Sequence, residues 1–298
     1  MNKKDYILKV DSEGKITISL GGKCTLNCKH CYTNTSSFVH QPQISPKTAS
    51  KLLQDCDAEF STICVSGDID CFLDPELGIE LLTNIVENFE TQNIMFTTRL
   101  IPQQNVIEKL IKLGEICTAR KQLFIPCISL VSFNYPNVVE NAKKVNSSIE
   151  RLDFFKKLSN SGLPCFLTLR PTFPFSLVPF DEIEKILDYV DDSPAAVLGE
   201  VLLLDAKNEI AQKLAIVKSP EDQFEESKMT FIEQPIIWKK LYIKHEHRLI
   251  KEACNRRGLP FFLRSMSAVH YLKRINIFDG QWRHCSDFFD TELVGIYP

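Results

Sequence analysis

The sequence lacks the features of a membrane, secreted or nucleic-acid-coating protein. It has no uninterrupted apolar run of the roughly 18 residues that a membrane-spanning helix needs. The first residues, Met1 to Tyr6, carry charge with no apolar stretch behind them, so we expect no secretion signal. The net charge of −3 argues against nucleic-acid binding, although it does not exclude a local basic patch. We therefore expect a cytoplasmic protein with no membrane partner.

The sequence also lacks internal repeats and low-complexity segments. Its 298 residues suit one large domain, or one domain with a tail. A hydrophobic content of 44% and a charged content of 24% are ordinary for a globular enzyme.

Most of the cysteines lack a close partner. Beyond the first three of the 11, no two lie within two to four residues of each other, which argues against a second local metal cluster. Without a secretion signal we expect reduced thiols rather than disulfides. These scattered residues are Cys56, Cys64, Cys71, Cys117, Cys127, Cys165, Cys254 and Cys285.

Three cysteines near the N-terminus are the exception. Cys24, Cys28 and Cys31 have the spacing C-x3-C-x2-C, and Tyr32 follows directly. A loop this short can turn three thiolates toward one point, but it cannot easily supply a fourth. Structural zinc sites and ordinary electron-transfer [4Fe–4S] clusters both use four protein ligands. A zinc site would need His30, or a distant Cys or His, as its fourth ligand.

This motif resembles the signature of the radical S-adenosylmethionine (radical SAM) superfamily. It directly follows the expected strand Lys15–Leu20, which is where the signature lies in that family. The resemblance implies a [4Fe–4S] cluster on Cys24, Cys28 and Cys31. It also implies that S-adenosyl-L-methionine binds the open iron and is cleaved reductively to a 5′-deoxyadenosyl radical.

Alternating strand and helix signals fill the first two thirds of the chain. The near-continuous apolar strands predict a parallel sheet covered by helices, in an α/β fold. We expect six strands, at about 15–20, 62–66, 93–98, 123–129, 165–170 and 200–204. The interpretation is a (β/α)6 partial TIM-type barrel, which the family resemblance also implies, with its chemistry at the carboxyl ends of the strands.

After residue 205 the chain has a different sequence pattern. We expect residues 1–205 to form the barrel core with the cluster loop. Residues 206–298 are expected to form a helical or irregular extension that packs on the barrel or caps it. Within this extension the sequence predicts a helix over 236–257 and allows one more strand at 259–263.

Several further residues are candidates for binding the cofactor. Ser66, Gly67 and Asp68 end the second strand, where the family has a Gly-Gly-Glu-like turn that receives the amino group of S-adenosylmethionine. The resemblance also implies a cofactor role for Tyr32, next to the last cysteine. Thr97 and Ser129, at the ends of the third and fourth strands, carry hydroxyls that can bond the cofactor.

Two arginines and two cysteines complete the candidates. Arg170 ends the fifth strand and can clamp a carboxylate of the cofactor or of an acidic substrate. Arg151 begins a helix, where a surface ion pair is the alternative to a site role. The pattern around Arg151 and Arg170 has a weak similarity to spore photoproduct lyase relatives, which does not carry over their activity. Cys71 is a candidate catalytic residue, as a hydrogen-atom donor or thiyl relay, and a small core residue is the alternative. Cys285 is a candidate catalytic residue that the tail of the chain would carry over the site.

The sequence thus predicts a radical SAM enzyme that abstracts hydrogen from a substrate. We expect a small-molecule substrate and a flavodoxin- or ferredoxin-like electron donor. The alternatives are a peptide or nucleic-acid substrate, or a non-catalytic zinc or iron–sulfur module. The sequence does not choose the fate of the substrate radical.

Overall fold

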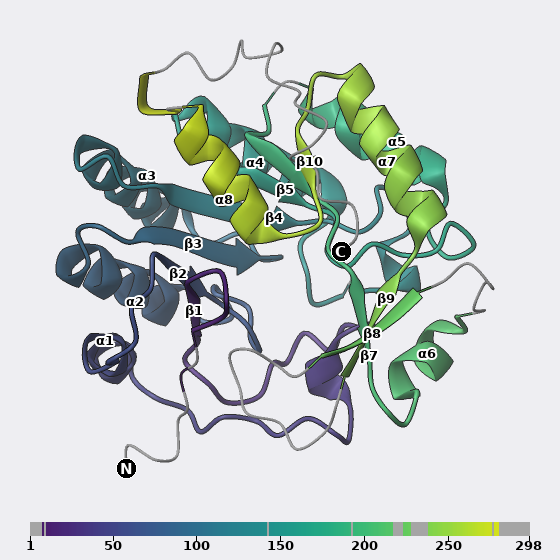
Figure 1. Cartoon of the computed structure of the whole chain (residues 1–298), viewed down its shortest axis with the longest axis horizontal. Helices are drawn as coiled ribbons and strands as arrows, with labels where there is room; N and C mark the ends of the chain where they lie inside the picture. Colours follow the sequence, from purple (N-terminus) through teal and green to yellow (C-terminus); the bar gives the residue numbers. More distant parts are fainter. Residues whose placement is uncertain are drawn as a thin grey trace.

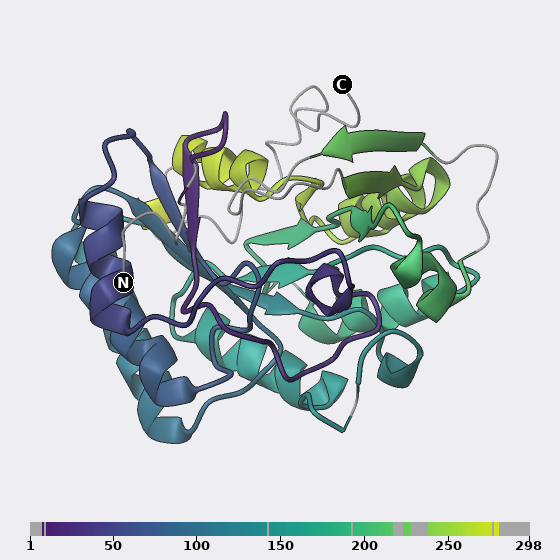
Figure 2. The same ribbon diagram turned by 90° about the horizontal axis from the view of Figure 1, so that it is seen from below.

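The computed structural model describes residues 8, 10–141, 143–191, 193–216, 223–227, 238–275 and 277–279. Over these residues the chain forms an α/β fold around a parallel sheet that curls into a half-barrel (Figures 1 and 2). The sheet has seven strands in the described part of the chain, in the order β1-β2-β3-β4-β5-β6-β10. They are β1 (Lys15–Ile18), β2 (Thr62–Val65), β3 (Asn93–Thr98), β4 (Phe124–Ser129), β5 (Phe166–Thr168), β6 (Ala196–Leu198) and β10 (Phe261–Phe262).

The helices lie on both sides of this sheet. The crossover helices α1 to α5 cover its outer side, and α8 lies against its inner side (Figures 1 and 2). Among the described residues, no helix combines the length and the apolar character needed to cross a membrane. The helices are α1 (Pro46–Gln54), α2 (Pro75–Asn88), α3 (Gln104–Ala119), α4 (Ser148–Asn160), α5 (Phe180–Val190), α6 (Glu209–Leu214), α7 (Lys244–Arg256) and α8 (Ser265–Arg274).

Local sequence signals explain where the crossover helices begin. Ser45 and Asp74 cap α1 and α2, each followed by proline at the first helical position. Ser147 and Glu150 form a reciprocal capping box at the start of α4. Gly162, at φ +87°, adopts the left-handed conformation just after α4 and lets the chain turn toward β5.

The two faces of the sheet have separate apolar cores. Residues such as Ile18, Ile63 and Phe96 face the outer helices. Cys64, Met95, Cys127 and Phe166 face inward and pack with Met266, Val269 and Leu272 of α8. Because successive side chains of a strand alternate between faces, this division fixes which residues at the strand ends face the interior.

The position of the sixth strand corrects one prediction. The sequence suggests a strand over 200–204, but β6 is Ala196–Leu198, and Leu202–Leu204 (β7) belongs to a separate sheet. That sheet is antiparallel in the order β7-β9-β8, with β8 at Gln223–Ser227 and β9 at Trp238–Tyr242. Gly199 separates the two strands, and a Cβ there would lie 2.4 Å from the Phe261 ring. The short strand beside this glycine is easily missed, because the longer apolar run after it looks more like a strand.

The described part of the extension contains more strands than the sequence suggests. The expected helix over 236–257 is in fact strand β9 followed by α7, whereas the optional strand at 259–263 is confirmed as β10. β10 pairs with β6 in parallel and extends the main sheet beyond the expected six strands. The main sheet therefore draws a strand from beyond the boundary expected at residue 205.

Candidate functional site

The cysteine loop leaves β1 at its carboxyl end and alternates between buried and exposed residues. Cys24 and Cys28 are buried, and Cys31 is half-buried. Burial raises the pKa of the Cys24 thiol, and that of Cys28 to about 11, although the Arg99 charge opposes the shift at Cys28. Among the described residues, no three His, Cys, Asp or Glu side chains converge closely enough to hold a metal ion. The loop thus gathers three thiols in one region without bringing them to ligating distance.

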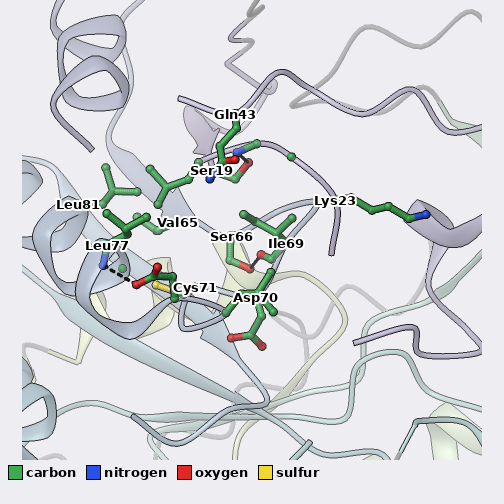
Figure 3. Close-up of a pocket in the computed structure, with 16 residues that line it drawn as sticks. Ser19, Lys23, Gln43, Val65, Ser66, Ile69, Asp70, Cys71, Leu77 and Leu81 are labelled. Carbon is green, nitrogen blue, oxygen red and sulfur yellow. Dashed lines mark hydrogen bonds between the residues drawn. The ribbon is translucent and has the colours of Figure 1, made fainter. Parts of the chain in front are cut away.

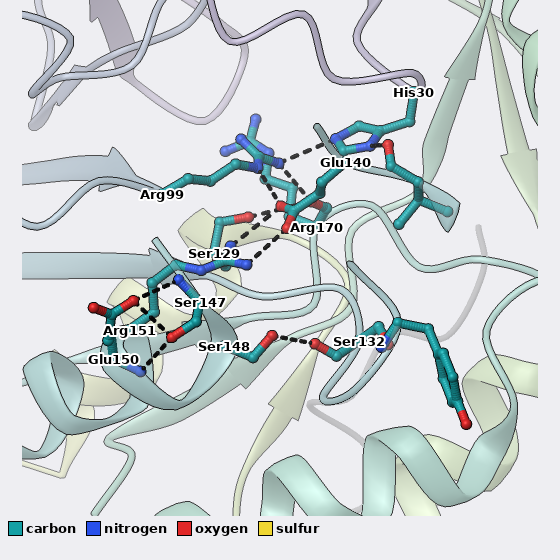
Figure 4. A network of polar contacts seen from close by, with 12 residues as sticks. His30, Arg99, Ser129, Ser132, Glu140, Ser147, Ser148, Glu150, Arg151 and Arg170 are labelled. Atoms are coloured by element: carbon teal, nitrogen blue, oxygen red, sulfur yellow. Dashed lines mark hydrogen bonds and ion pairs between the residues drawn. The ribbon is translucent and has the colours of Figure 1, made fainter. Parts of the chain in front are cut away.

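Both ring nitrogens of His30, which lies in the same loop, form hydrogen bonds. With Nδ1 protonated, it donates to the Val139 carbonyl at 2.9 Å, and its Nε2 accepts from Arg99 Nη2 at 3.2 Å (Figure 4). Burial and the Arg99 charge lower the pKa of the imidazole to about 3, so it is neutral. Neither ring nitrogen is free, and His30 is therefore not placed to be a fourth metal ligand.

Arg99 belongs to a buried ionic network behind the loop (Figure 4). Its Nε donates to Glu140 Oε1 at 3.0 Å, and Arg151 Nη2 donates to Glu140 Oε2 at 2.7 Å. Arg151 also donates to the Ser129 carbonyl at 2.6 Å, while Arg99 donates to the Arg170 carbonyl at 2.9 Å. The Glu140 carboxylate thus links Arg99, the hydrogen-bond partner of His30 in the cysteine loop, to Arg151. Through these two arginines the network reaches the ends of β4 and β5. Arg151, a candidate cofactor ligand from sequence, is fully buried in this network.

Tyr32, the residue after the last cysteine, contacts the turn that follows β2. The Tyr32 hydroxyl donates to the Gly67 carbonyl, and the Tyr32 ring contacts Phe38 and Trp238. Beside this contact the Asp68 carboxylate is buried, and within the described residues neither of its oxygens has a hydrogen bond of ordinary geometry, although the Ser19 hydroxyl lies nearby. Burial raises the pKa of Asp68, while the nearby Ser19 hydroxyl opposes the shift. The structure therefore brings Tyr32 into contact with Gly67, the residue before Asp68.

Other candidates lie on the inner face at the strand ends. Thr97 and Ser129 are two residues beyond the inward-facing Met95 and Cys127, so they share that face. Thr97 Oγ1 is buried and has no hydrogen-bond partner among the described residues, whereas Ser129 Oγ donates to the Arg170 carbonyl at 3.3 Å. Ser66 differs: it adopts φ +85°, and its hydroxyl donates to the Ile69 carbonyl at 2.5 Å.

Arg170 forms an ion pair with Glu200 that leaves part of each side chain accessible. Its Nε lies 2.9 Å from Glu200 Oε2, and the two side chains are 36% and 18% exposed. Burial alone would lower the pKa of Arg170, but Glu200 and the inward-facing thiols Cys64 and Cys127 raise it. These neighbours place the pair on the inner face, where it can receive a polar group of a ligand.

Cys71 lies away from this inner face. It lines a pocket between the ends of β1 and β2 and the first turns of α2, with Leu77 and Leu81 (Figure 3). Its thiol is buried, and burial raises its pKa well above the ordinary value. The other candidate thiol, Cys285, lies outside the described residues.

Asp70 joins the turn after β2 to the end of β3, and sequence reasoning missed it. Its carboxylate accepts from the Thr98 hydroxyl at 2.7 Å and from the Arg99 backbone N–H at 2.7 Å. It also accepts from the Phe72 N–H at 3.0 Å. Burial raises its pKa, and these donors oppose the shift. The only signal available from sequence is a second acid two residues after Asp68.

We expect Asp70→Ala to lower the free energy of unfolding by about 2 kcal/mol, because it leaves buried donors without their charged acceptor. Asp74→Ala is the matched control, since it removes only the cap of α2 and costs about 1 kcal/mol. Urea denaturation of both variants measures the difference. Equal losses would show that the Asp70 contacts do not hold the turn.

Glu140 and Glu200 were also missed. Glu140 lies in an irregular loop and Glu200 just beyond β6, so neither belongs to a motif. The partners of Glu140 lie 11 and 41 positions away and the partner of Glu200 lies 30 positions away, and no local pattern indicates such pairs.

Comparisons with known proteins add little to this description. No protein-family model and no curated protein match the sequence. Among solved structures, the chain has a likeness to a putative fructose-1,6-biphosphate aldolase from Coccidioides immitis, with 14% sequence identity and a TM-score of 0.26. The match covers 51% of this chain and 47% of that one, so the chain spans about half of the length of that relative. A likeness at this TM-score carries no argument. The chain is thus an α/β protein with a curled parallel half-barrel, and its function is argued from its own residues.

Proposed function

We propose that the protein is a radical SAM enzyme that abstracts hydrogen from a small-molecule substrate. Cys24, Cys28 and Cys31 would hold a [4Fe–4S] cluster. When bound, this group supplies the electron that cleaves S-adenosyl-L-methionine and releases a 5′-deoxyadenosyl radical.

The hydrogen bonding of His30 is the observation that supports this proposal most directly. Both of its ring nitrogens are engaged, by Val139 and Arg99, so the loop offers three thiols and no fourth ligand of its own. A closed zinc site needs four ligands, whereas a cluster that binds a cosubstrate needs three. The donor set therefore favours a site with one open position.

The fit of the cluster depends on the chemistry of the donors, because the thiols do not converge in the structure. Metal sites seldom preform fully, and binding is coupled to local ordering of the ligands. Cys24 and Cys28 are already buried on the same side of the loop, together with Val145. The loop would have to close further around the cluster.

Two buried polar groups near the ends of β2 and β3, which lack a hydrogen bond of ordinary geometry among the described residues, suit the cosubstrate. The buried Asp68 carboxylate can accept hydrogen bonds from an ammonium group, which would offset the cost of burying it. The buried Thr97 hydroxyl can bond a further polar group. Tyr32 holds the turn that carries Asp68 next to the cysteine loop, so it acts as a positioning residue.

The inner face beyond these residues would hold the substrate. Arg170 and Glu200 offer a guanidinium and a carboxylate there, while Ser129 fixes the Arg170 backbone. Their task is to keep the reacting carbon beside the radical and to keep water away from it.

Anaerobic reconstitution with iron and sulfide tests the proposal. A brown protein that forms 5′-deoxyadenosine from S-adenosyl-L-methionine after reduction with dithionite is the expected result. A colourless protein with one zinc per chain and no cleavage would overturn it and favour a non-catalytic metal-binding module. Incubation of the active protein with deuterated cell metabolites, followed by mass analysis of 5′-deoxyadenosine, then identifies the substrate.

A further inference from the structure

The side chain of Thr33 contacts one of the three thiols of the cysteine loop. Its Oγ1 lies 3.0 Å from Cys31 Sγ, within hydrogen-bond distance. A free thiol can donate or accept in such a contact, but a cysteine that ligates a metal is a thiolate and can only accept. In a loaded site the Thr33 hydroxyl therefore donates to the Cys31 sulfur.

The Thr33 hydroxyl is buried and has no alternative partner. Thr33 is 1% exposed, and the described residues offer its Oγ1 no other hydrogen bond. Without the sulfur, the hydroxyl would be a buried polar group with no partner, which costs free energy. The contact with Cys31 is therefore favoured by the surroundings of Thr33 as well as by the sulfur itself.

A short turn fixes Thr33 relative to Cys31. Thr33 is the middle residue of the 3-10 turn Tyr32–Asn34 (η2), which Cys31 directly precedes. The Asn34 N–H donates to the Cys31 carbonyl at 3.1 Å, and Asn34 Nδ2 donates to the Cys28 carbonyl at 3.2 Å. Because these contacts all lie within the loop and the turn that follows it, the hydroxyl and the sulfur can move together when the loop closes around a cluster.

The other two cysteines of the loop have different surroundings. Burial raises the pKa of Cys24 and of Cys28, and the opposing influences are the Leu26 backbone at Cys24 and the Arg99 charge at Cys28. Among the described residues, no side-chain hydroxyl donates to either of these sulfurs. Cys31 is thus the loop cysteine whose hydrogen bond can be removed by changing a single side chain.

We propose that Thr33 is a positioning residue that raises the reduction potential of the cluster through its hydrogen bond to Cys31, and this inference rests on the proposed function. Reduction adds one electron from a low-potential reductant such as dithionite, which is oxidised, and makes the sulfur ligands more negative. A hydrogen bond donated to a ligand sulfur stabilises this more negative state more strongly, so it favours uptake of the electron. No covalent bond forms or breaks in this step, and no proton is transferred.

A redox titration of the reconstituted protein, followed by electron paramagnetic resonance without S-adenosyl-L-methionine, tests the proposal. Thr33→Val keeps the shape of the side chain and removes its hydroxyl. We expect the equilibrium constant for reduction to fall about tenfold, which corresponds to a potential about 59 mV more negative. Thr33→Ser keeps the hydroxyl and should retain the wild-type potential.

Thr35→Val is the matched control. Thr35 is also buried and lies just beyond the same turn, but its hydroxyl donates to the Tyr32 carbonyl at 2.8 Å and not to a sulfur. This variant should keep the wild-type potential. All the variants should bind as much iron as the wild type, because Thr33 contacts the sulfur and not the metal.

An unchanged potential in Thr33→Val, or an equal shift in Thr35→Val, overturns the inference. Loss of iron from Thr33→Val alone also overturns it and makes Thr33 a residue needed for cluster assembly. If Thr33→Val does not fold, Thr33→Ala and Thr33→Ser give the same comparison, since only the serine keeps the hydroxyl. Failure of the proposed function is recognised separately, in a wild type that forms no cluster or does not cleave S-adenosyl-L-methionine with dithionite.

Discussion

Replacing Cys24, Cys28 or Cys31 by alanine is expected to abolish cleavage of S-adenosyl-L-methionine. Each substitution leaves two thiolates in a loop whose histidine is already engaged, so the loop itself offers no substitute ligand. We expect iron bound after reconstitution to fall below about a tenth of the wild-type amount, with loss of the brown absorbance, since each thiolate bonds the cluster directly. Iron analysis and 5′-deoxyadenosine assay measure the two effects.

Cys56→Ser is the matched control for these variants. Cys56 is a half-buried free thiol just after α1, outside the cysteine loop. It should keep wild-type iron and activity. If a triad variant retained iron and activity while Cys56→Ser lost them, the assignment of the cluster ligands would be wrong.

The variant Glu140→Gln is expected to cost about 3–5 kcal/mol of unfolding free energy. It leaves the buried guanidinium of Arg151 and the largely buried one of Arg99 without their shared anion, and uncompensated buried charges are costly. Glu150→Gln is the control, because this exposed residue keeps its capping geometry as an amide and should change stability by less than about 0.5 kcal/mol. Urea denaturation at pH 7 compares the two.

The loss of stability in Glu140→Gln is expected to depend on pH. Burial alone would raise the pKa of Glu140, but the charges of Arg151 and Arg99 outweigh it and lower the pKa. The stabilisation is therefore present above the ordinary glutamate pKa of about 4.3 and is lost as the pH falls through the lowered value. The difference between wild type and Glu140→Gln should be constant from pH 7 to 5 and should shrink only below about pH 4. A difference that vanished by pH 6 would contradict an ionised, paired Glu140.

The parts of the fold that follow local rules could be predicted from sequence. The strand β3 and the caps at Ser45 and Asp74 depend on apolar runs and on turn chemistry close by in the chain. The assignment of β6 and β9 depends on distant partners. β6 becomes a sheet strand because it lies between β5 and β10, and β9 because β7 and β8 pair with it on both sides.

The candidate site also has parts that could be predicted from sequence and parts that could not. The cysteine loop and the turn at Gly67 and Asp68 have recognisable spacing, and the structure places them beside each other through Tyr32. The network of Glu140, Arg99 and His30 joins three segments that are far apart in sequence. Nothing in the local pattern distinguishes its glutamate from a surface residue, so the network emerges only when the chain is folded.

The strand β10 has a consequence for how the chain is made. Synthesis delivers the first six strands before Phe261 and Phe262 emerge, and the inner apolar face waits still longer for Met266 and Leu272 of α8. During that interval β6 is an unpaired edge beside an uncovered hydrophobic surface, the kind of nascent species that aggregates readily. In a chain that ended at residue 205, one edge of β6 and the inner apolar face would therefore lack the partners that β10 and α8 supply.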